Sequence, residues 1–393
     1  MPKKSPPSSS ELEFKSYHDY NGDRPVQTLI FHNNGSSWWI KVVVDWSLPQ
    51  VIVDLGYLQR RSIPRRFLEA VDFGQLRLLE DTVTMITLNL TKQSQNSITI
   101  RDGYQTSANY FISAAGQMCY EITEDPKRVT YPTLDRNKCL PTVEASSLQN
   151  IEAIAPRVST VIFKQQKFAF KTIDHPIYEP GDTDHILDEI DALTQLHGQP
   201  NIGQLVGLVV SDNPYKTYQS TDLPVVVRGF LLEYYPKGSL EQIIAEDKLR
   251  NGSLLIQWAL QIVRALESLH KRGRSHLDIK PSNIVFDDSE DAILIDISGT
   301  GGYTLEWISP EMHIYLQQDG EIAAANAPFG MRIATDCWAY GRVLSTIAEK
   351  SDIRASEMLQ SVANDLTVAG LEARISLRDA LTKLEEKNDE RWP

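Results

Sequence analysis

The chain has 393 residues, of which 41% are hydrophobic and 23% are charged. These are ordinary values for a globular protein with a hydrophobic core, and at roughly 150 residues per domain the length predicts two or three domains. Collagen-like, low-complexity and wholly disordered classes are excluded. No apolar run approaches the roughly 18 residues that a membrane helix needs. The basic start of the chain is not followed by an apolar run, so we expect no secretory signal.

Charge and cysteine content indicate which partners and which cellular compartment to expect. The chain carries 39 Lys and Arg against 52 Asp and Glu, a net charge of −13. Because such an acidic chain repels phosphate backbones, we do not expect nucleic acid as a partner. The three cysteines, Cys119, Cys139 and Cys337, have neither disulfide-framework nor metal-site spacing. We therefore expect an intracellular protein, cytoplasmic or nuclear, without a membrane partner.

The first third of the chain predicts a β-rich module. Residues 1–10 are rich in Pro, Ser and Lys and predict a disordered tail, followed by strand-like patterns over residues 11–145. The clearest strands flank the turn signal Asn33-Asn34-Gly35. These two strands span 27–31 and 38–44, and further predicted elements are strands at 82–90, 97–100 and 110–113 and a short helix at 63–71. No catalytic constellation occurs here, and binding a protein partner is a candidate role for this module.

A different pattern follows an expected linker at 144–150. It begins with strand-like runs and one helical run of apolar residues spaced three and four apart, and it ends in a mostly helical half. The predicted elements are strands at 158–163, 167–173, 205–210 and 225–234, a helix at 183–196 and a long helix at 253–271.

The clearest chemistry lies in the string from His276 to Asn283, which reads H-x-D-x-K-x-x-N. Asp278 can accept a proton from an attacking hydroxyl, and Lys280 can neutralise charge on a migrating phosphoryl group. Asn283 offers an oxygen ligand to a magnesium ion. Asp296 follows a short apolar strand, 18 residues after Asp278, where a carboxylate can hold the same metal.

With these motifs, residues 150–390 resemble the eukaryotic protein kinase superfamily. The resemblance implies an α+β, bilobal fold: a small five-stranded lobe with its αC helix over residues 150–235 and a larger helical lobe over 236–393, preceded by the β-rich module. It implies that Lys171 of the segment F-A-F-K anchors the α- and β-phosphates of ATP and pairs with Glu189. The other residues implied to contact ATP are Val161, Ala169, Glu233, Tyr235 and Val285. The implied metal ligands are Asn283 and Asp296, and the implied catalytic residues are Asp278 and Lys280.

Further motifs match the family and favour serine/threonine transfer. Ser309-Pro310-Glu311 stands in for A-P-E, with Arg374 as the partner of Glu311, and Asp336 opens a D-x-W-x-x-G string that secures the catalytic loop. The lysine at 280 is typical of the serine/threonine class. Thr304 is implied to contact the catalytic Asp and Lys.

Three departures from the family pattern bear on activity. The nucleotide-covering loop has Ile154, Pro156 and Ser159 where the family has glycines, which predicts a weaker grip on phosphate. Leu277 replaces an arginine that normally pairs with a phosphorylated activation segment, so we expect no such requirement. The segment from Asp296 to Glu311 is short, and residues 312–332 predict an inserted loop.

Two functions therefore stay open. One is a protein kinase that uses Mg-ATP to phosphorylate Ser or Thr in a protein substrate. The other is a pseudokinase or scaffold with weak or no nucleotide binding. Small-molecule phosphotransferases rank third because they usually lack the S/A-P-E and D-x-W-x-x-G strings. The departures also resemble divergent kinase-like proteins of filamentous fungi.

Overall fold

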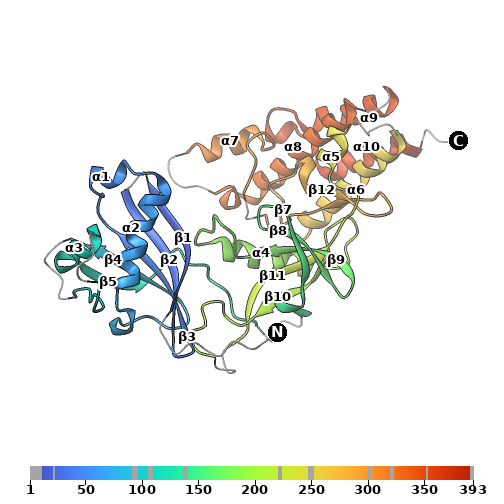
Figure 1. Ribbon diagram of the computed structural model, residues 1–393. Helices are drawn as coiled ribbons and strands as arrows, with labels where there is room; N and C mark the ends of the chain where they lie inside the picture. Colours follow the sequence, from blue (N-terminus) through green and yellow to red (C-terminus); the bar gives the residue numbers. More distant parts are fainter. Residues whose placement is uncertain are drawn as a thin grey trace. The chain divides into compact units, whose positions relative to one another are not determined.

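The computed structural model describes residues 11–20, 23–90, 96–104, 109–135, 140–219, 224–246, 252–299, 302–318, 323–350 and 353–389. The chain divides into two compact units (Figure 1). The first unit comprises residues 1–134, 178–180 and 211–226, and the second comprises 135–177, 181–210 and 227–393. This division falls at residue 134, where the sequence predicted a limit near 145. It also assigns 211–226, a part of the predicted small lobe, to the first unit.

The first unit contains a sheet that is five strands wide in the described part of the chain, in the order β1-β2-β3-β4-β5. The strands β1, β2 and β3 form an antiparallel meander, β4 joins β3 in parallel, and β5 returns antiparallel to β4. The turn between β2 and β3 has positive φ at Asn34 and Gly35, as its sequence predicted. The strand bounds are β1 Glu11–Tyr20, β2 Asp23–Asn33, β3 Ser36–Val44, β4 Val83–Asn89 and β5 Cys119–Glu124.

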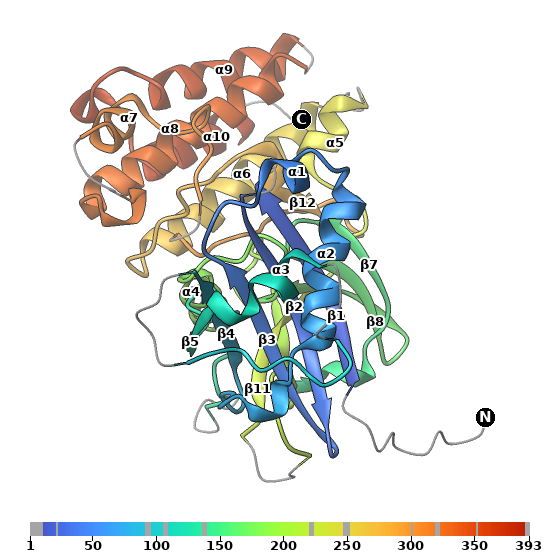
Figure 2. The same ribbon diagram turned by 60° about the vertical axis from the view of Figure 1, so that its left-hand side comes forward.

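A helix covers one face of this sheet. Figure 2 shows α2 (Tyr57–Ala70) lying across the strands, and its buried Phe67 and Leu68 belong to the same core cluster as Ile40 and Val42 of β3. Alternate residues of β3 therefore face the helix, as a half-buried strand requires. The short helix α1 (Gln50–Val53) precedes α2. The β-rich module that the sequence predicted is confirmed.

Two strand predictions in this unit were wrong, and one predicted helix begins earlier than expected. The predicted strand at 110–113 is the helix α3 (Tyr110–Ala114), because the Asn109 side chain accepts hydrogen bonds from the amides of Phe111 and Ile112 and starts a helix. Residues 97–100 form only isolated bridges among the described residues. The helix predicted at 63–71 begins earlier, at Tyr57, and contains Pro64.

The second unit begins with a mixed sheet whose described strands follow the order β6-β10-β11-β9-β8-β7. This is one strand more than predicted, because β6 pairs in parallel with β10. The backbones of β6 and β10 come so close that residue 207 must be glycine, since a Cβ there would lie 2.7 Å from the carbonyl oxygen of Pro141. The predicted linker at 144–150 is thus structured. The bounds are β6 Thr142–Glu144, β7 Gln149–Ala155, β8 Val158–Phe163, β9 Gln166–Thr172, β10 Leu205–Ser211 and β11 Val226–Glu233, with helix α4 Asp182–Gln195.

The rest of the second unit is mainly helical and packs around α6 and α8. The fully buried Tyr340 of α8 donates a hydrogen bond to the carbonyl of Ala259 in α6, at 2.8 Å. The predicted loop at 312–332 is helical at both ends, in α7 and α8. The bounds are α5 Leu240–Ala245, α6 Gly252–His270, β12 Ile284–Phe286, β13 Ala292–Leu294, α7 Pro310–Leu316, α8 Phe329–Ala348, α9 Ile353–Leu366 and α10 Leu377–Asp389. The predicted α+β class is confirmed.

Among the helices that the structure describes, none combines the length and apolar character needed to cross a bilayer.

Candidate active site

A lysine on the second unit's sheet joins two acidic side chains. The Nζ atom of Lys171, on β9, donates to Oε2 of Glu189 on α4 at 2.6 Å and to Oδ1 of Asp296 at 2.7 Å. Burial alone would lower the pKa of Lys171, but the charges of the two carboxylates outweigh burial and raise it above its ordinary value. Lys171 in turn lowers the pKa of Asp296 against the effect of burial. The lysine therefore stays charged.

Lys171 is positioned by the close approach of the β9 and β11 backbones. Lys171 lies opposite Phe230 of β11, and the neighbouring Gly229 has a φ of 150°. A Cβ at Gly229 would lie 2.1 Å from the carbonyl oxygen of Lys171, so only glycine fits there. Glu189 is brought to the lysine by α4, whose buried face also carries Ile186 and Ile190.

A second polar cluster surrounds Asp278. Lys280 donates from Nζ to Oδ2 of Asp278 at 2.6 Å and to Oγ1 of Thr304 at 2.9 Å. The Thr304 hydroxyl donates to Oδ1 of Asp278 at 2.9 Å. Asn283 donates from Nδ2 to the carbonyl oxygen of Asp278 at 2.8 Å. The contacts of Thr304 with both residues confirm the prediction, and they hold the carboxylate in one orientation.

The loop that carries Asp278 is held by the buried carboxylate of Asp336 on α8. Asp336 accepts hydrogen bonds from the backbone amides of His276 and Leu277, each at 2.8 Å, and lies 2.8 Å from Nε2 of His270. Leu277 has a φ of 66°, a conformation uncommon for a residue other than glycine. The predicted role of Asp336 in securing this loop is confirmed, because its two bonds hold the strained residue.

Two further contacts connect this loop to the turn at Asp296. The His276 ring nitrogen Nε2 lies 2.9 Å from the carbonyl oxygen of Ile295. Gly299 has a φ of 67°, and a Cβ there would lie 2.2 Å from the carbonyl oxygen of Ser275. The backbone around Asp296, itself at a φ of 63°, is thus defined by its neighbours.

A model of the protein kinase domain matches residues 157–369, more than half of the chain. The chain belongs to the protein kinase family. The match begins at residue 157, so residues 11–134 lie outside it.

Curated relatives are serine/threonine kinases of low identity. Serine/threonine-protein kinase 12 of Arabidopsis thaliana is 29% identical over 124 residues, 31% of this chain and 24% of that protein. Maternal embryonic leucine zipper kinase of Xenopus laevis is 28% identical over 141 residues, 36% of this chain and 19% of that protein. A serine/threonine-protein kinase-like protein of Arabidopsis thaliana is 29% identical over 171 residues, 42% of this chain and 44% of that protein. The chain therefore spans less than half the length of these relatives.

Within this kinase fold, Val161 does not lie where the family resemblance placed it. Val161 is fully buried opposite Phe168, in a core cluster with Val209 and Leu231. Side chains alternate along a strand, so this face is opposite to the one that carries Lys171. The neighbouring Thr160 lies opposite Ala169 and shares the face of Lys171. The assignment was one residue out of register. Only the pairing of β8 with β9 reveals this, because plain alternation counted back from Lys171 reaches residue 161 and not residue 160.

The other predicted nucleotide contacts lie on strands or just beyond one. Ala169 is opposite Leu232 of β11, and Glu233 is the exposed last residue of that strand. The hydroxyl of Tyr235 accepts a hydrogen bond from the amide of Gln204 at 3.2 Å. Val285 is a half-buried residue of β12. Among the described hydrogen bonds, none joins these side chains to the Lys171 or Asp278 clusters.

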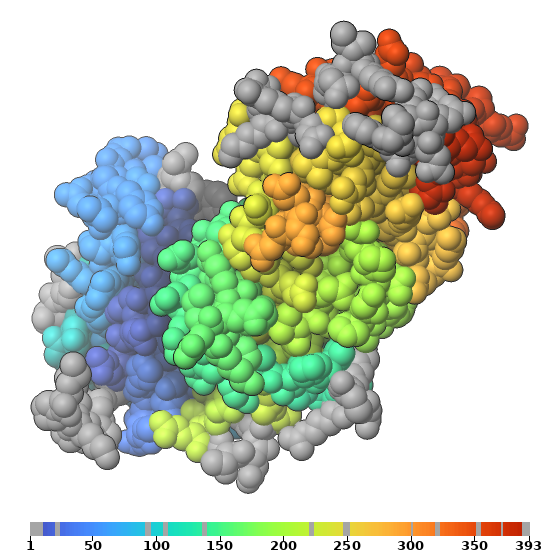
Figure 3. Space-filling model, turned by 90° about the vertical axis from the view of Figure 1, so that its right-hand side faces the viewer, coloured from blue at the N-terminus to red at the C-terminus, as the bar shows by residue number. Residues whose placement is uncertain are grey.

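The hairpin of β7 and β8 has an anchor that sequence reasoning missed. Every residue of β7 is exposed, and the hairpin lies at the surface in the space-filling view (Figure 3). At its turn, Arg157 donates to Oδ1 of Asp182, at 2.6 Å, in the first turn of α4. Asp182 also lies 3.1 Å from Nε2 of His175. Because Arg157 and Asp182 are 25 residues apart, no local pattern signals their pairing.

The predicted ion pair of Glu311 and Arg374 is confirmed. We expect this pair to make the stability of the fold depend on pH. Arg374 donates to both carboxylate oxygens of Glu311, at 2.6 and 3.2 Å. Burial alone would raise the pKa of Glu311, but the arginine outweighs it and lowers the pKa below 4.5. The stabilisation is therefore complete above that value and lost as the pH falls through the lowered pKa of the folded state.

Urea unfolding between about pH 6 and pH 3 tests this pair. The Glu311→Gln variant should lose less stability than the wild type over this interval. Equal losses in the two proteins would contradict a stabilising pair.

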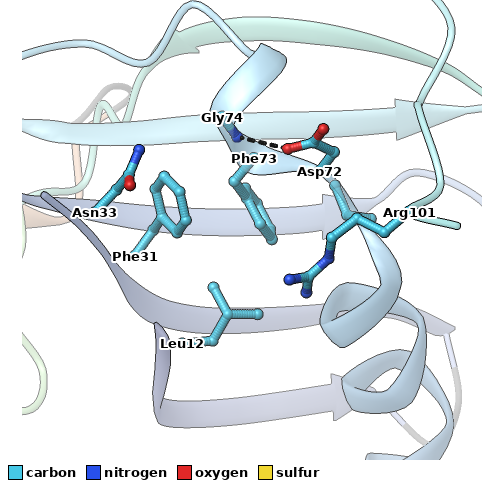
Figure 4. Close-up of a pocket in the computed structure, with 8 residues that line it drawn as sticks. Leu12, Phe31, Asn33, Asp72, Phe73, Gly74 and Arg101 are labelled. Atoms are coloured by element: carbon cyan, nitrogen blue, oxygen red, sulfur yellow. Dashed lines mark hydrogen bonds between the residues drawn. The ribbon is translucent and has the colours of Figure 1, made fainter. Parts of the chain in front are cut away.

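A separate cavity of about 230 Å³ lies within the first unit (Figure 4). The guanidinium group of Arg101 extends between Phe73 and Leu12 at this cavity, and among the described residues its buried Nε has no hydrogen-bond partner. Asp72 accepts a hydrogen bond from the amide of Gly74 at 3.2 Å. The cavity is lined by Asn33, Asp72 and Arg101 together with several apolar side chains, and its described lining contains no lysine.

Proposed function

We propose that this chain is a protein kinase that transfers the γ-phosphoryl group of Mg-ATP to a Ser or Thr hydroxyl of a protein substrate. The observation that carries the proposal is the pair of polar clusters in the second unit. In one, Lys171 bridges Glu189 and Asp296, and in the other, Lys280 and Thr304 orient Asp278. Members of this family use such groups to hold phosphates and to accept the proton of the attacking hydroxyl.

The donor atoms present fit a magnesium ion. Asn283 uses its amide nitrogen on Asp278, so its carbonyl oxygen is the atom it can offer, and Asp296 offers a carboxylate. Magnesium prefers such oxygen ligands and completes its shell with phosphate oxygens and water. When bound, the ion would neutralise charge on the ATP phosphates.

The chain's own residues then have distinct tasks. Asp278 accepts the proton of the substrate hydroxyl, and Thr304 and Lys280 keep its carboxylate in place. Lys280 also brings a positive charge close to the atoms that react. Lys171 holds the α- and β-phosphates, and Glu189 keeps its side chain extended. The raised pKa of Lys171 ensures that its charge is present at neutral pH.

The second candidate function is a pseudokinase that binds partners without turnover. It is favoured by the β7–β8 hairpin, which contains no glycine between residues 149 and 163. Pro156 at the turn has no N–H to offer a phosphate. Against it stand the seven side chains of the two clusters, each of which is hydrogen-bonded within its cluster.

Thermal unfolding of the full chain with ATP, with and without magnesium, separates the two functions. A ligand at 100 times its dissociation constant stabilises a fold by about 2.7 kcal/mol. A magnesium-dependent rise in melting temperature, lost in the Lys171→Met variant, is the expected result. If millimolar ATP leaves the melting temperature of the wild type unchanged, the kinase proposal fails and the pseudokinase takes its place.

A further inference from the structure

The connection between β10 and β11 joins two strands of the second unit, but it belongs to the first unit. β10 ends at Ser211 and β11 begins at Val226. Most connections between secondary-structure elements are shorter than this one, and long ones often have a function. Here the described residues of the connection, 212–219 and 224–225, contact several separate stretches of the first 134 residues.

The centre of the connection is Thr217, which is only 2% exposed. Its amide donates to Oδ1 of Asp81 at 2.9 Å, and its hydroxyl oxygen accepts from the amide of Asp81 at 2.8 Å. Its carbonyl oxygen accepts from the amide of Ser37 at 2.9 Å. The amide, the carbonyl oxygen and the hydroxyl oxygen of this buried residue are thus all hydrogen-bonded to the first unit, so displacing the connection would leave several groups unpaired.

Aromatic packing adds to these hydrogen bonds. The ring of Tyr215 lies 5.7 Å from the rings of both Trp39 and Tyr131. The indole N–H of Trp39 donates to the carbonyl oxygen of Pro214 at 3.0 Å. Asn213 donates from Nδ2 to the carbonyl oxygen of Asp81 at 2.9 Å. The docked segment therefore gives the Trp39 ring both an apolar contact and a hydrogen-bond acceptor.

The far end of the connection has an anchor of its own. The amide of Leu134 donates to the carbonyl oxygen of Val225 at 3.0 Å, and Thr133 forms an antiparallel bridge with Val226. Val226 is the first residue of β11. The start of this strand is therefore tied to the first unit through backbone bonds.

β11 leads from this anchor to the active-site lysine. It pairs antiparallel with β9, where Phe230 lies opposite Lys171, and it ends at Glu233. Phe230 comes only four residues after the anchored start of the strand at Val226. We therefore expect a constraint on the first residue of β11 to reach Lys171 through this pairing.

We propose that the first unit is a positioning element for the nucleotide site and acts through the docked β10–β11 connection. Docking orders β11 from its first residue, and β11 in turn holds the strand that carries Lys171. Asp81, Thr217 and Trp39 are positioning residues because they act through β11. The ordering of β11 is independent of the proposed kinase activity, and its effect on ATP rests on that proposed function.

Hydrogen exchange of the full chain without nucleotide tests the ordering of β11. Thr217→Val removes the hydroxyl that Asp81 uses, and Trp39→Phe removes the bond to Pro214. Each should lower the protection of the β11 amides by roughly tenfold, while α6 and α8 keep theirs. The control is Asp72→Ala, which removes a cap within the first unit whose described contacts do not involve the connection. It should leave β11 unchanged.

One result of this exchange experiment would contradict the proposal. If the connection loses protection in these variants while β11 keeps it, the docked segment is a passive loop and the proposal is wrong. Thr217→Ser keeps the hydroxyl and should therefore keep the wild-type protection of β11. This control shows that the loss in Thr217→Val comes from the missing hydroxyl and not from misfolding. In a second measurement, the dissociation constant of Mg-ATP should rise several-fold in Thr217→Val but not in Asp72→Ala. If the variants lose β11 protection and the wild type binds no Mg-ATP, only the proposed function is contradicted.

Discussion

The Asp278→Asn variant is expected to lose phosphotransfer by roughly three orders of magnitude, the range typical of removing a general base. An amide cannot take the proton of the substrate hydroxyl. The replacement has nearly the same shape, so the loop should remain folded. Because Lys171 and Asp296 are unchanged, stabilisation by Mg-ATP should persist. ADP formation by the full chain, with a protein acceptor added, measures this loss.

A matched control for this variant is Asp288→Asn, a change at an exposed aspartate in the same half of the second unit. The control should keep wild-type turnover. If Asp278→Asn retains turnover as well, Asp278 does not accept the proton and the proposed mechanism is wrong. Loss of both turnover and Mg-ATP stabilisation would instead indicate that the loop had rearranged.

The Asp336→Ala variant is expected to destabilise the second unit by roughly 3–5 kcal/mol, the range seen when a buried charged partner is removed. Asp336 is fully buried, and its removal leaves the amides of His276 and Leu277 without acceptors. Each unsatisfied buried group costs about 1–3 kcal/mol. Leu277 would also lose the bonds that hold it at positive φ, so the loop around Asp278 should relax and turnover should fall.

Urea unfolding combined with hydrogen exchange at α6 and α8 measures this effect, because exchange assigns the transition to the second unit. Asp336→Asn should be milder, since one carbonyl oxygen can still accept a bond. A loss below about 1 kcal/mol in Asp336→Ala would mean that water replaces the carboxylate and that the loop holds itself.

The sequence alone determined the elements whose signals are local. The strands around Asn33-Asn34-Gly35 and the helix near 183–196 follow from turn chemistry and from apolar spacing, which act over a few residues. The residues from His276 to Asn283 are likewise close along the chain. Their chemistry therefore follows from residue type and spacing, and the contacts of Thr304 and Glu311 follow from the family resemblance.

Only the tertiary structure decided the features that depend on distant pairing. Val161 turned to the core because strand register is set by the partner strand, and a shift of one residue exchanges the two faces. Residues 110–113 became a helix because a cap outweighed weak strand propensity. The docking of Thr217 on Asp81 and the pairing of Arg157 with Asp182 join residues far apart in the chain. Such contacts leave no local pattern, so the role that we propose for the first unit rests on the tertiary structure alone.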